Sequence, residues 1–302
     1  MALYDGPIFD SHHHIIWDWQ KNYPWMSGPM RPMIFNDDWS GMKRDYRIED
    51  LLDDFAPHNV TGSVHVQANF DKSRPLDETR ELQRLCDEHG FPTGIVAYAD
   101  LTAPDAAAVI DSHLAFAATR GIRHQVYYHP TNEYWQYVDR KDYCLSDDFR
   151  RGLAAVQARG LTFDWQGFAP QFADLATLAG DFPELRFCLV HAGMLTDLDS
   201  GTVSEWDAAL DTLLPCGNVL IKVSGLNTYS RRLDEPLMDL VTNTVLDKFG
   251  PDRCFFGSNY PVERMWTSFS DYLNAQKRVV AGRSVADQQK FFHDTAMAFY
   301  RI

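Results

Sequence analysis

Short apolar runs rich in β-branched and aromatic residues alternate along the chain with longer segments whose apolar residues recur at helical spacing. The short runs predict eight strands, at residues 8–16, 62–68, 93–99, 121–127, 162–165, 186–191, 218–223 and 254–256. The segments after them predict eight helices, at residues 48–55, 76–88, 106–119, 147–158, 170–179, 203–214, 236–249 and 267–280. Each predicted strand is therefore followed by one helix.

This strict alternation predicts an α/β fold with a parallel sheet, because parallel neighbours need a crossover connection. Eight repeats within 302 residues favour a (β/α)8 TIM barrel that occupies residues 1–302 as a single domain. No glycine-rich phosphate-binding motif follows a predicted strand, which argues against a nucleotide-binding sheet. A further helical segment, 284–300, is expected to pack outside the barrel as an extra C-terminal helix.

Two long segments interrupt the rhythm, residues 17–46 after the first strand and 128–145 after the fourth, and both are rich in aromatic residues. Loops that follow the strands of a barrel lie at its C-terminal end, where such folds bind substrate. We expect these insertions to be walls or lids of a pocket. Alternatively, they only cover the mouth of the barrel, or they form the contact of a homodimer.

Composition excludes several classes of function. The formal net charge of −14 argues against nucleic acid as a partner, although it does not exclude an anionic small-molecule substrate. The five cysteines are widely spaced, without a C-x-x-C motif, and indicate neither a disulfide framework nor a zinc ribbon. Without a signal-peptide pattern or an apolar run of about 18 residues, the chain is expected to be cytoplasmic and to have no membrane partner.

Three consecutive histidines, His12, His13 and His14, end the first predicted strand. Because alternate residues of a strand face the same side, His12 and His14 are expected to point into the barrel and His13 outward. His191 ends the sixth predicted strand and should face the same mouth. Neighbouring imidazoles can hold a divalent metal or polarise a substrate oxygen, whereas the simpler interpretation is hydrogen-bonded structural histidines.

Polar residues near the ends of other predicted strands are further candidates. Arg123 is the first choice for binding a substrate carboxylate, because a guanidinium can bind it in a bidentate manner. Asp164, at the end of the fifth strand, is a candidate proton acceptor. The remaining candidates for contact with substrate are His65, Gln67, Gln125 and Trp165.

Three motifs in order resemble one family. Asp-Ser-His-His-His at 10–14, Val-His-Ala-Gly at 190–193 and Phe-Gly-Ser-Asn-Tyr-Pro-Val at 256–262 are similar to the amidohydrolase-related proteins of the lactonase group. That group includes 2-pyrone-4,6-dicarboxylate hydrolase and sugar-acid lactonases. Because the motifs fall on strands one, six and eight, the resemblance covers nearly the whole chain.

The resemblance implies that His12 and His14 form the first-strand pair and that His191 is the sixth-strand histidine. Asn259 falls where most of the superfamily has an aspartate that accepts the proton of the attacking water, and Tyr260 follows it as a substrate contact. An amide is neither a general base nor a good metal ligand. One alternative is therefore a single divalent metal, with Zn²⁺ preferred, held by His12, His14 and His191 or by the first-strand pair with Asp164. The other alternative is a metal-free site.

The function expected on this basis is a hydrolase that opens a lactone or similar cyclic ester by attack of water. His12 and His14 would stabilise the oxyanion, while His191 or Asp164 would take the water proton. The aromatic loop residues suit a planar or largely apolar substrate. Two alternatives stay open: a nonoxidative decarboxylase on the same barrel, and a weakly active barrel that binds a metabolite, the latter because of Asn259.

Overall fold

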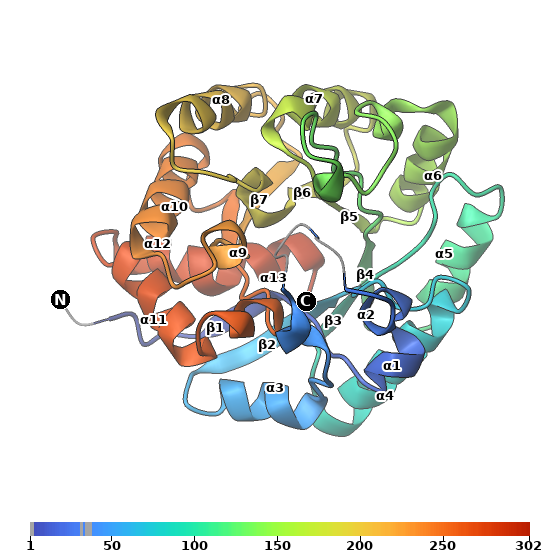
Figure 1. The fold of residues 1–302 in the computed structure, drawn as a ribbon, viewed down its shortest axis with the longest axis horizontal. Coiled ribbons are helices and arrows are strands. Elements are labelled where there is room, and N and C mark those ends of the chain that lie inside the picture. The colour runs from blue at the N-terminus through green and yellow to red at the C-terminus, as the bar shows by residue number, and fades with distance from the viewer. Residues whose placement is uncertain (1–2, 31–32, 34–37) are drawn as a thin grey trace.

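Eight parallel strands form the centre of the molecule in the computed structural model, which describes residues 3–30, 33 and 38–302. The strands follow one another around the sheet in the order of the chain. They are β1 Ile8–His13, β2 Val60–Val66, β3 Gly94–Ala97, β4 Thr119–Ile122, β5 Thr162–Trp165, β6 Arg186–Leu189, β7 Val219–Val223 and β8 Cys254–Phe256. Figure 1 shows them as a ring with the helices outside, so the predicted (β/α)8 barrel is confirmed.

The helices after the strands surround the barrel and cover its outer face. They are α3 Ile48–Phe55, α4 Pro75–His89, α5 Ala106–Leu114, α6 Asp147–Ala158, α7 Phe172–Asp181, α8 Ser200–Asp211, α10 Glu235–Phe249 and α11 Phe269–Val279. Their buried apolar residues, such as Leu82, Leu153 and Leu210, form the layer between helices and strands. No helix in the described ranges has the length and apolar character to cross a membrane.

The barrel closes where β1 meets the segment after β8. Asn259 donates its backbone N–H to the carbonyl of His12 at 2.7 Å, and His14 donates to the carbonyl of Tyr260 at 2.7 Å. The motifs that the sequence predicts at the two ends of the chain are therefore joined directly by backbone hydrogen bonds. This seam fixes the relative positions of the first-strand histidines and Asn259.

Several strands are shorter than the apolar runs that predict them. The runs 8–16, 121–127 and 186–191 become strands that end at His13, Ile122 and Leu189. Most residues that follow stay buried although they leave the sheet, and His191 is half-buried, so burial extends the apolar pattern beyond the strand. Consequently His14 and His191 belong to the loops after the strands, where the chain is free to orient each side chain separately.

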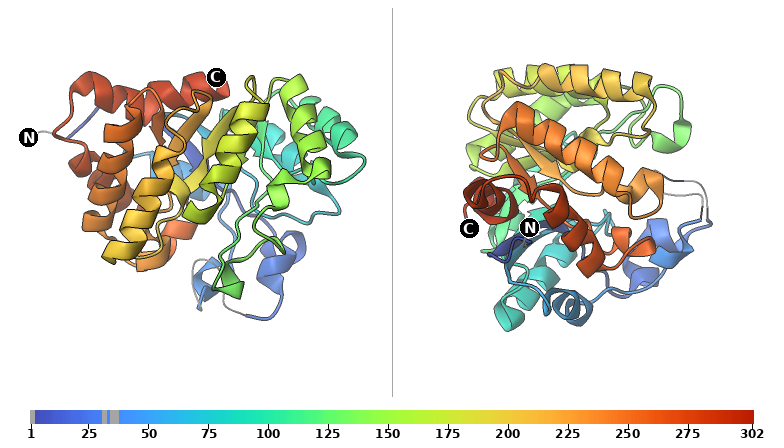
Figure 2. Two further views of the ribbon diagram at one scale, coloured as in Figure 1. Left: turned by 90° about the horizontal axis from the view of Figure 1, so that it is seen from above. Right: turned by 90° about the vertical axis from the view of Figure 1, so that its left-hand side faces the viewer.

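The C-terminal segment is divided into α12 Val285–Gln289, a π-helical turn Lys290–Asp294 and α13 Thr295–Tyr300. It covers the end of the barrel opposite to the loop helices α1 Trp19–Asn22 and α2 Pro24–Ser27 (Figure 2). Phe299 and Tyr300 pack with barrel residues such as Phe9, Val64 and Phe255. The segment is thus a plug at the N-terminal end of the barrel, a more specific position than the outer packing that the sequence predicts.

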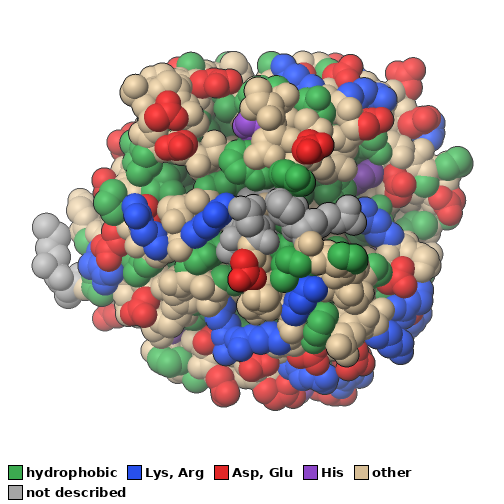
Figure 3. Space-filling view, viewed as in Figure 1, with side chains coloured by type: hydrophobic (Ala, Val, Ile, Leu, Met, Phe, Trp, Pro, Cys, Tyr) green, Lys and Arg blue, Asp and Glu red, His purple; other side chains and the backbone are tan. Residues whose placement is uncertain are grey.

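The two insertions lie at the other end of the barrel. Residues 17–46 include α1, α2 and the short turn Ser40–Met42, while 31–32 and 34–37 lie outside the described residues. Residues 128–145 include the turns Glu133–Trp135 and Tyr143–Leu145. On this face apolar side chains gather around the centre, and acidic and basic ones are mixed towards the rim (Figure 3).

Candidate active site

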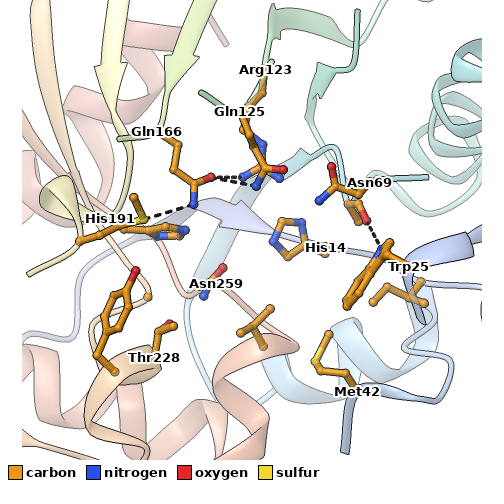
Figure 4. Close-up of a pocket in the computed structure, with 16 residues that line it drawn as sticks. His14, Trp25, Met42, Asn69, Arg123, Gln125, Gln166, His191, Thr228 and Asn259 are labelled. Atoms are coloured by element: carbon orange, nitrogen blue, oxygen red, sulfur yellow. Dashed lines mark hydrogen bonds between the residues drawn. The ribbon is translucent and has the colours of Figure 1, made fainter. Parts of the chain in front are cut away.

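A cavity opens at the C-terminal ends of the strands, and its walls contain several predicted residues (Figure 4). The polar residues of its wall are His14, Asn69, Arg123, Gln125, Gln166, His191, Thr228, Tyr229 and Asn259. The described wall holds two imidazoles, one guanidinium and no carboxylate. The cavity therefore favours a neutral or anionic ligand over a cationic one.

The three histidines that the sequence selects lie together. The ring centroids of His12 and His14 are 5.0 Å apart, and those of His12 and His191 are 4.8 Å apart. His12 is fully buried behind the cavity wall, and neither of its ring nitrogens has a hydrogen-bond partner among the described residues. His13 points away, because its Nε2 lies 2.9 Å from the Ser63 hydroxyl and its ring packs against Phe55 of α3.

One backbone carbonyl fixes the tautomer of His14. The Nδ1 atom lies 2.7 Å from the carbonyl oxygen of Val66, and because a carbonyl only accepts, Nδ1 carries the proton. A neutral ring then has a lone pair on Nε2. His14 is therefore equipped to accept a proton at Nε2, rather than to donate a hydrogen bond to an oxyanion as the sequence predicts.

His191 lies in a strained turn directly after β6. The φ angles of His191, Ala192, Gly193 and Met194 are 57°, 48°, 77° and 56°, a left-handed conformation that residues other than glycine rarely adopt. This turn brings the His191 Nδ1 to 2.8 Å from the hydroxyl of Ser224, which can donate or accept. Such strain is typical of a position that is held for function.

Gly225 allows His191 and Asn259 to approach each other. A Cβ at this position would lie 2.7 Å from the His191 Nδ1 and 3.0 Å from the Asn259 Nδ2, and the φ of Gly225 is +63°. Both the positive φ and the lack of space require glycine here. The amide of Asn259, whose own φ is 59°, thus lies beside the imidazole in the wall of the cavity.

Arg123 supplies the cation of the cavity. Its Nη2 donates to the carbonyl of Gln67 and its Nη1 to the Oε1 of Gln166 at 3.4 Å, while its Nε has no partner among the described residues. Gln125 also donates to the Gln166 Oε1, at 3.0 Å. The guanidinium is therefore held firmly from two sides in the wall of the cavity.

Burial determines the charges of these groups. It lowers the pKa of His12 and His14 well below the ordinary value of 6.5, and it lowers the pKa of His191 to about 3. The positive charges of Lys222 and Arg123 act in the same direction. At neutral pH the three imidazoles are therefore uncharged.

Three predicted contacts are tied to the protein instead of lining the cavity. His65 accepts from the Ile15 N–H at 3.0 Å and lies 3.3 Å from the carboxylate of Glu78. Gln67 receives the N–H of Asn69 at 2.7 Å. Trp165 is fully buried and packs against Phe172 of α7. Successive side chains of a strand point to opposite sides of the barrel wall. The apolar pattern of the sequence does not show which of these sides each polar residue faces.

Asp164 and Tyr260 are likewise engaged elsewhere. Asp164 forms a fully buried ion pair with Lys222 at 2.6 Å and accepts from the hydroxyl of Tyr300 at 3.0 Å. The ring of Tyr260 packs on Phe269, and its hydroxyl donates to a backbone carbonyl. The structure therefore brings His14, His191, Arg123, Gln125 and Asn259 into the wall, and places His12 directly behind it.

Sequence reasoning missed several wall residues. Gln166 follows Trp165 and receives hydrogen bonds from both Arg123 and Gln125. Asn69 lies after β2 with a φ of 55°, and its Oδ1 accepts from Tyr137 of the second insertion at 3.0 Å. Thr228 and Tyr229 lie on the short helix α9 Asn227–Ser230. These residues share one feature in the sequence, a polar side chain shortly after a predicted strand. Many other positions have the same feature, so it does not single out the site.

The first insertion forms part of the wall, as the first interpretation of these segments expects, whereas no described residue of 128–145 lines the cavity. Trp25 and Met42 of the first insertion line the cavity, and Trp25 donates to the Ala68 carbonyl at 3.1 Å. In the second insertion, Trp135 packs against Phe168 and Tyr229. The outer part of the cavity is thus aromatic and apolar.

The fit of a metal ion can be judged from the donors. Imidazoles are good ligands for zinc, and the unpartnered nitrogens of His12 favour a ligand at this point. In the described ranges, however, no three His, Cys, Asp or Glu side chains are grouped so that they could hold a metal ion. The arrangement of the described side chains therefore does not fit a preformed three-ligand centre.

Comparison with known proteins agrees with this geometry. The uncharacterized protein y4mH of Sinorhizobium fredii is 36% identical over 299 residues, 99% of each chain. An L-fucono-1,5-lactonase of Burkholderia multivorans is 27% identical, over 97% of this chain and 95% of its own. The crystal structure of an amidohydrolase from B. multivorans with bound zinc has a TM-score of 0.80 at 27% identity and covers 98% of this chain and all of its own.

The sequence model of the amidohydrolase family matches residues 9–302, which include all three motifs. The match, the barrel and the position of the histidines at its C-terminal end support one another. The chain therefore belongs to the amidohydrolase family and is a hydrolase.

Proposed function

We propose that the enzyme hydrolyses a lactone or a similar cyclic ester of a small substrate, carboxylated or derived from an aromatic compound. The observation that carries this proposal is a cavity wall that, in the described part of the chain, combines neutral imidazoles with one buried guanidinium and no carboxylate. Such a wall accepts an ester and the negative charge that forms on it. The relative named L-fucono-1,5-lactonase supports the choice of a lactone.

The tautomer of His14 suggests the route of the proton. Water attacks the carbonyl carbon, and its proton passes to the Nε2 of His14, which has the free lone pair. The ring C–O bond then breaks, and the same proton passes to the departing ring oxygen. One molecule of water is added and the carbon count is unchanged. This assignment exchanges the roles that the sequence suggests, because His14 becomes the base.

His191 is then the group that contacts the carbonyl oxygen. When the Ser224 hydroxyl donates to Nδ1, the proton of the neutral His191 ring lies on Nε2 and is available to the oxyanion. Arg123 retains the role that the sequence gives it and binds the carboxylate of the substrate from the cavity wall.

The test is ring opening of a panel of lactones by the wild-type protein and by two variants, His14→Asn and His191→Asn. Loss of a general base or oxyanion donor lowers kcat by about 10²-fold or more. His89→Asn is the matched control, since His89 is exposed on the surface and should not affect kcat. Equal rates for wild type and either site variant would remove that histidine from the mechanism, and a wild type inactive on every lactone would refute the proposal.

Metal content is a separate question, because one relative binds zinc while the three imidazoles here are not grouped for it. Metal analysis of protein purified without chelator decides between the two states. Stoichiometric zinc would indicate that His12, His14 and His191 are ligands of the metal ion. Full activity of protein that contains no metal would leave them as proton-transfer and hydrogen-bonding groups.

A further inference from the structure

A carboxyl group lies buried behind the wall of the cavity. Glu263 belongs to the short turn Val262–Met265 after β8 and has no exposed surface. Its Oε2 has no hydrogen-bond partner among the described residues. A buried carboxyl is costly for the fold unless it makes compensating contacts, so its position needs an explanation.

Glu263 contacts two polar residues of the wall. The Thr228 hydroxyl donates to its Oε1 at 3.3 Å. Asn259 precedes it by one helical turn, and the Glu263 N–H points to the Asn259 carbonyl at 3.4 Å. The amide of Asn259 also stabilises the ionised carboxyl. One carboxyl therefore connects the two residues that lie on the same side of the cavity.

These contacts decide which atoms face the ligand. When the carboxyl is ionised it only accepts, so it binds the hydroxyl proton of Thr228 and favours the orientation of Asn259 that turns the NH₂ group towards it. The Asn259 Oδ1 then faces the cavity, as Figure 4 shows, on the side of His14. An oxygen in this position can accept one hydrogen of a water molecule whose other proton passes to His14.

We propose that Glu263 is a positioning residue that orients the Asn259 amide, so that its oxygen holds the attacking water in place of the aspartate that is usual in this superfamily. This inference rests on the proposed hydrolysis. Asn259 cannot take the proton, but it can fix the direction of attack while His14 takes the proton. A carboxyl group thus lies one helical turn further along the chain, outside the cavity.

Protonation of Glu263 should weaken its interaction with the Asn259 amide and so the orientation of that amide. Burial raises the pKa of Glu263 to about 8, and the polar groups of Asn227, Thr228 and Asn259 oppose the rise. The other titratable groups that interact with it are the phenols of Tyr260 and Tyr272, whose pKa values are raised by burial, so they stay neutral. Because hydrogen bonds to a carboxylate are stronger than those to a carboxylic acid, kcat should rise with pH around pH 8.

The kinetic test uses Glu263→Gln, Asn259→Asp and the double variant. In Glu263→Gln an NH₂ group can face that of Asn259, so kcat should fall about 10-fold or more while KM changes little. The double variant exchanges acid and amide and should be more active than either single variant. The rise of kcat near pH 8 should be absent from Glu263→Gln and present in the exposed control Glu184→Gln.

Independent effects in the double variant, with no recovery, would overturn the proposal. A structural test stands apart from activity: in atomic-resolution crystal structures the Asn259 amide should turn over in Glu263→Gln relative to wild type. An unchanged amide would refute the positioning role even in an active hydrolase. If the amide turns over but the protein opens no lactone, Glu263 still positions Asn259, and the proposed function is refuted.

Discussion

At the scale of residues, the chemistry of the site depends on single hydrogen bonds. The Val66 carbonyl gives His14 a free lone pair, and the Ser224 hydroxyl orients His191. The sequence predicts that both histidines share a cavity, because each follows a strand of a barrel. It cannot predict their tautomers, since Val66 ends β2 and Ser224 follows β7, far along the chain from the histidines that they contact.

Arg123→Lys tests the binding of a substrate carboxylate. A lysine keeps the positive charge but loses the fork of donors that a carboxylate binds, so KM for a carboxylated lactone should rise about 10-fold or more. The KM for an uncharged lactone should change much less. Equal changes for the two substrates in steady-state kinetics would show that Arg123 does not recognise a carboxylate.

The raised pKa of Glu263 also predicts how stability depends on pH. The folded state keeps the proton up to about pH 8, whereas the unfolded chain releases it near the ordinary value of 4.5. Between these values the free energy of unfolding should fall as pH rises, by at most about 1.4 kcal/mol per pH unit from this group. Urea denaturation between pH 6.5 and 8 should show a smaller slope for Glu263→Gln than for wild type. Identical slopes would contradict the shift.

At the scale of elements, the positions of strands and helices follow from periodicity, but their ends do not. Helices α3 and α6 match the predicted ranges because a clear apolar face fills each of them. The predicted helix 106–119 ends at Leu114, because Ala118 belongs to the buried approach to β4. Similar buried segments after other strands contain the residues of the site. Because these segments lie outside the regular strands, the alternation of side chains along a strand does not predict where their side chains point.

The plug formed by α13 is anchored by one hydroxyl. Tyr300 accepts from the Lys222 Nζ at 2.7 Å and donates to Asp164, so it satisfies both members of a buried ion pair. Tyr300→Phe should lower the free energy of unfolding by about 1–3 kcal/mol, because these charged groups lose a partner. Tyr134→Phe, at a position that is 48% exposed, is the control and should change stability little. Equal stability of the two variants in urea denaturation would argue against this anchor.

At the scale of the whole molecule, charge differs between surface and cavity. The chain carries a formal net charge of −14, yet the only charged side chain of the described cavity wall is Arg123. The fold, the family and the meeting of His12, His14 and His191 could be predicted from the sequence. Gln166, Asn69 and Glu263 could not, because they act through contacts between loops that only the closed barrel brings together.

The central claim is that water attacks a cyclic ester in this cavity. Mass spectrometry of the product formed from the best lactone of the panel, in water enriched in ¹⁸O, tests it most directly. The account predicts one ¹⁸O atom in the new carboxylate per turnover and no carbon dioxide. Carbon dioxide release without uptake of ¹⁸O, as expected of a decarboxylase, would contradict it.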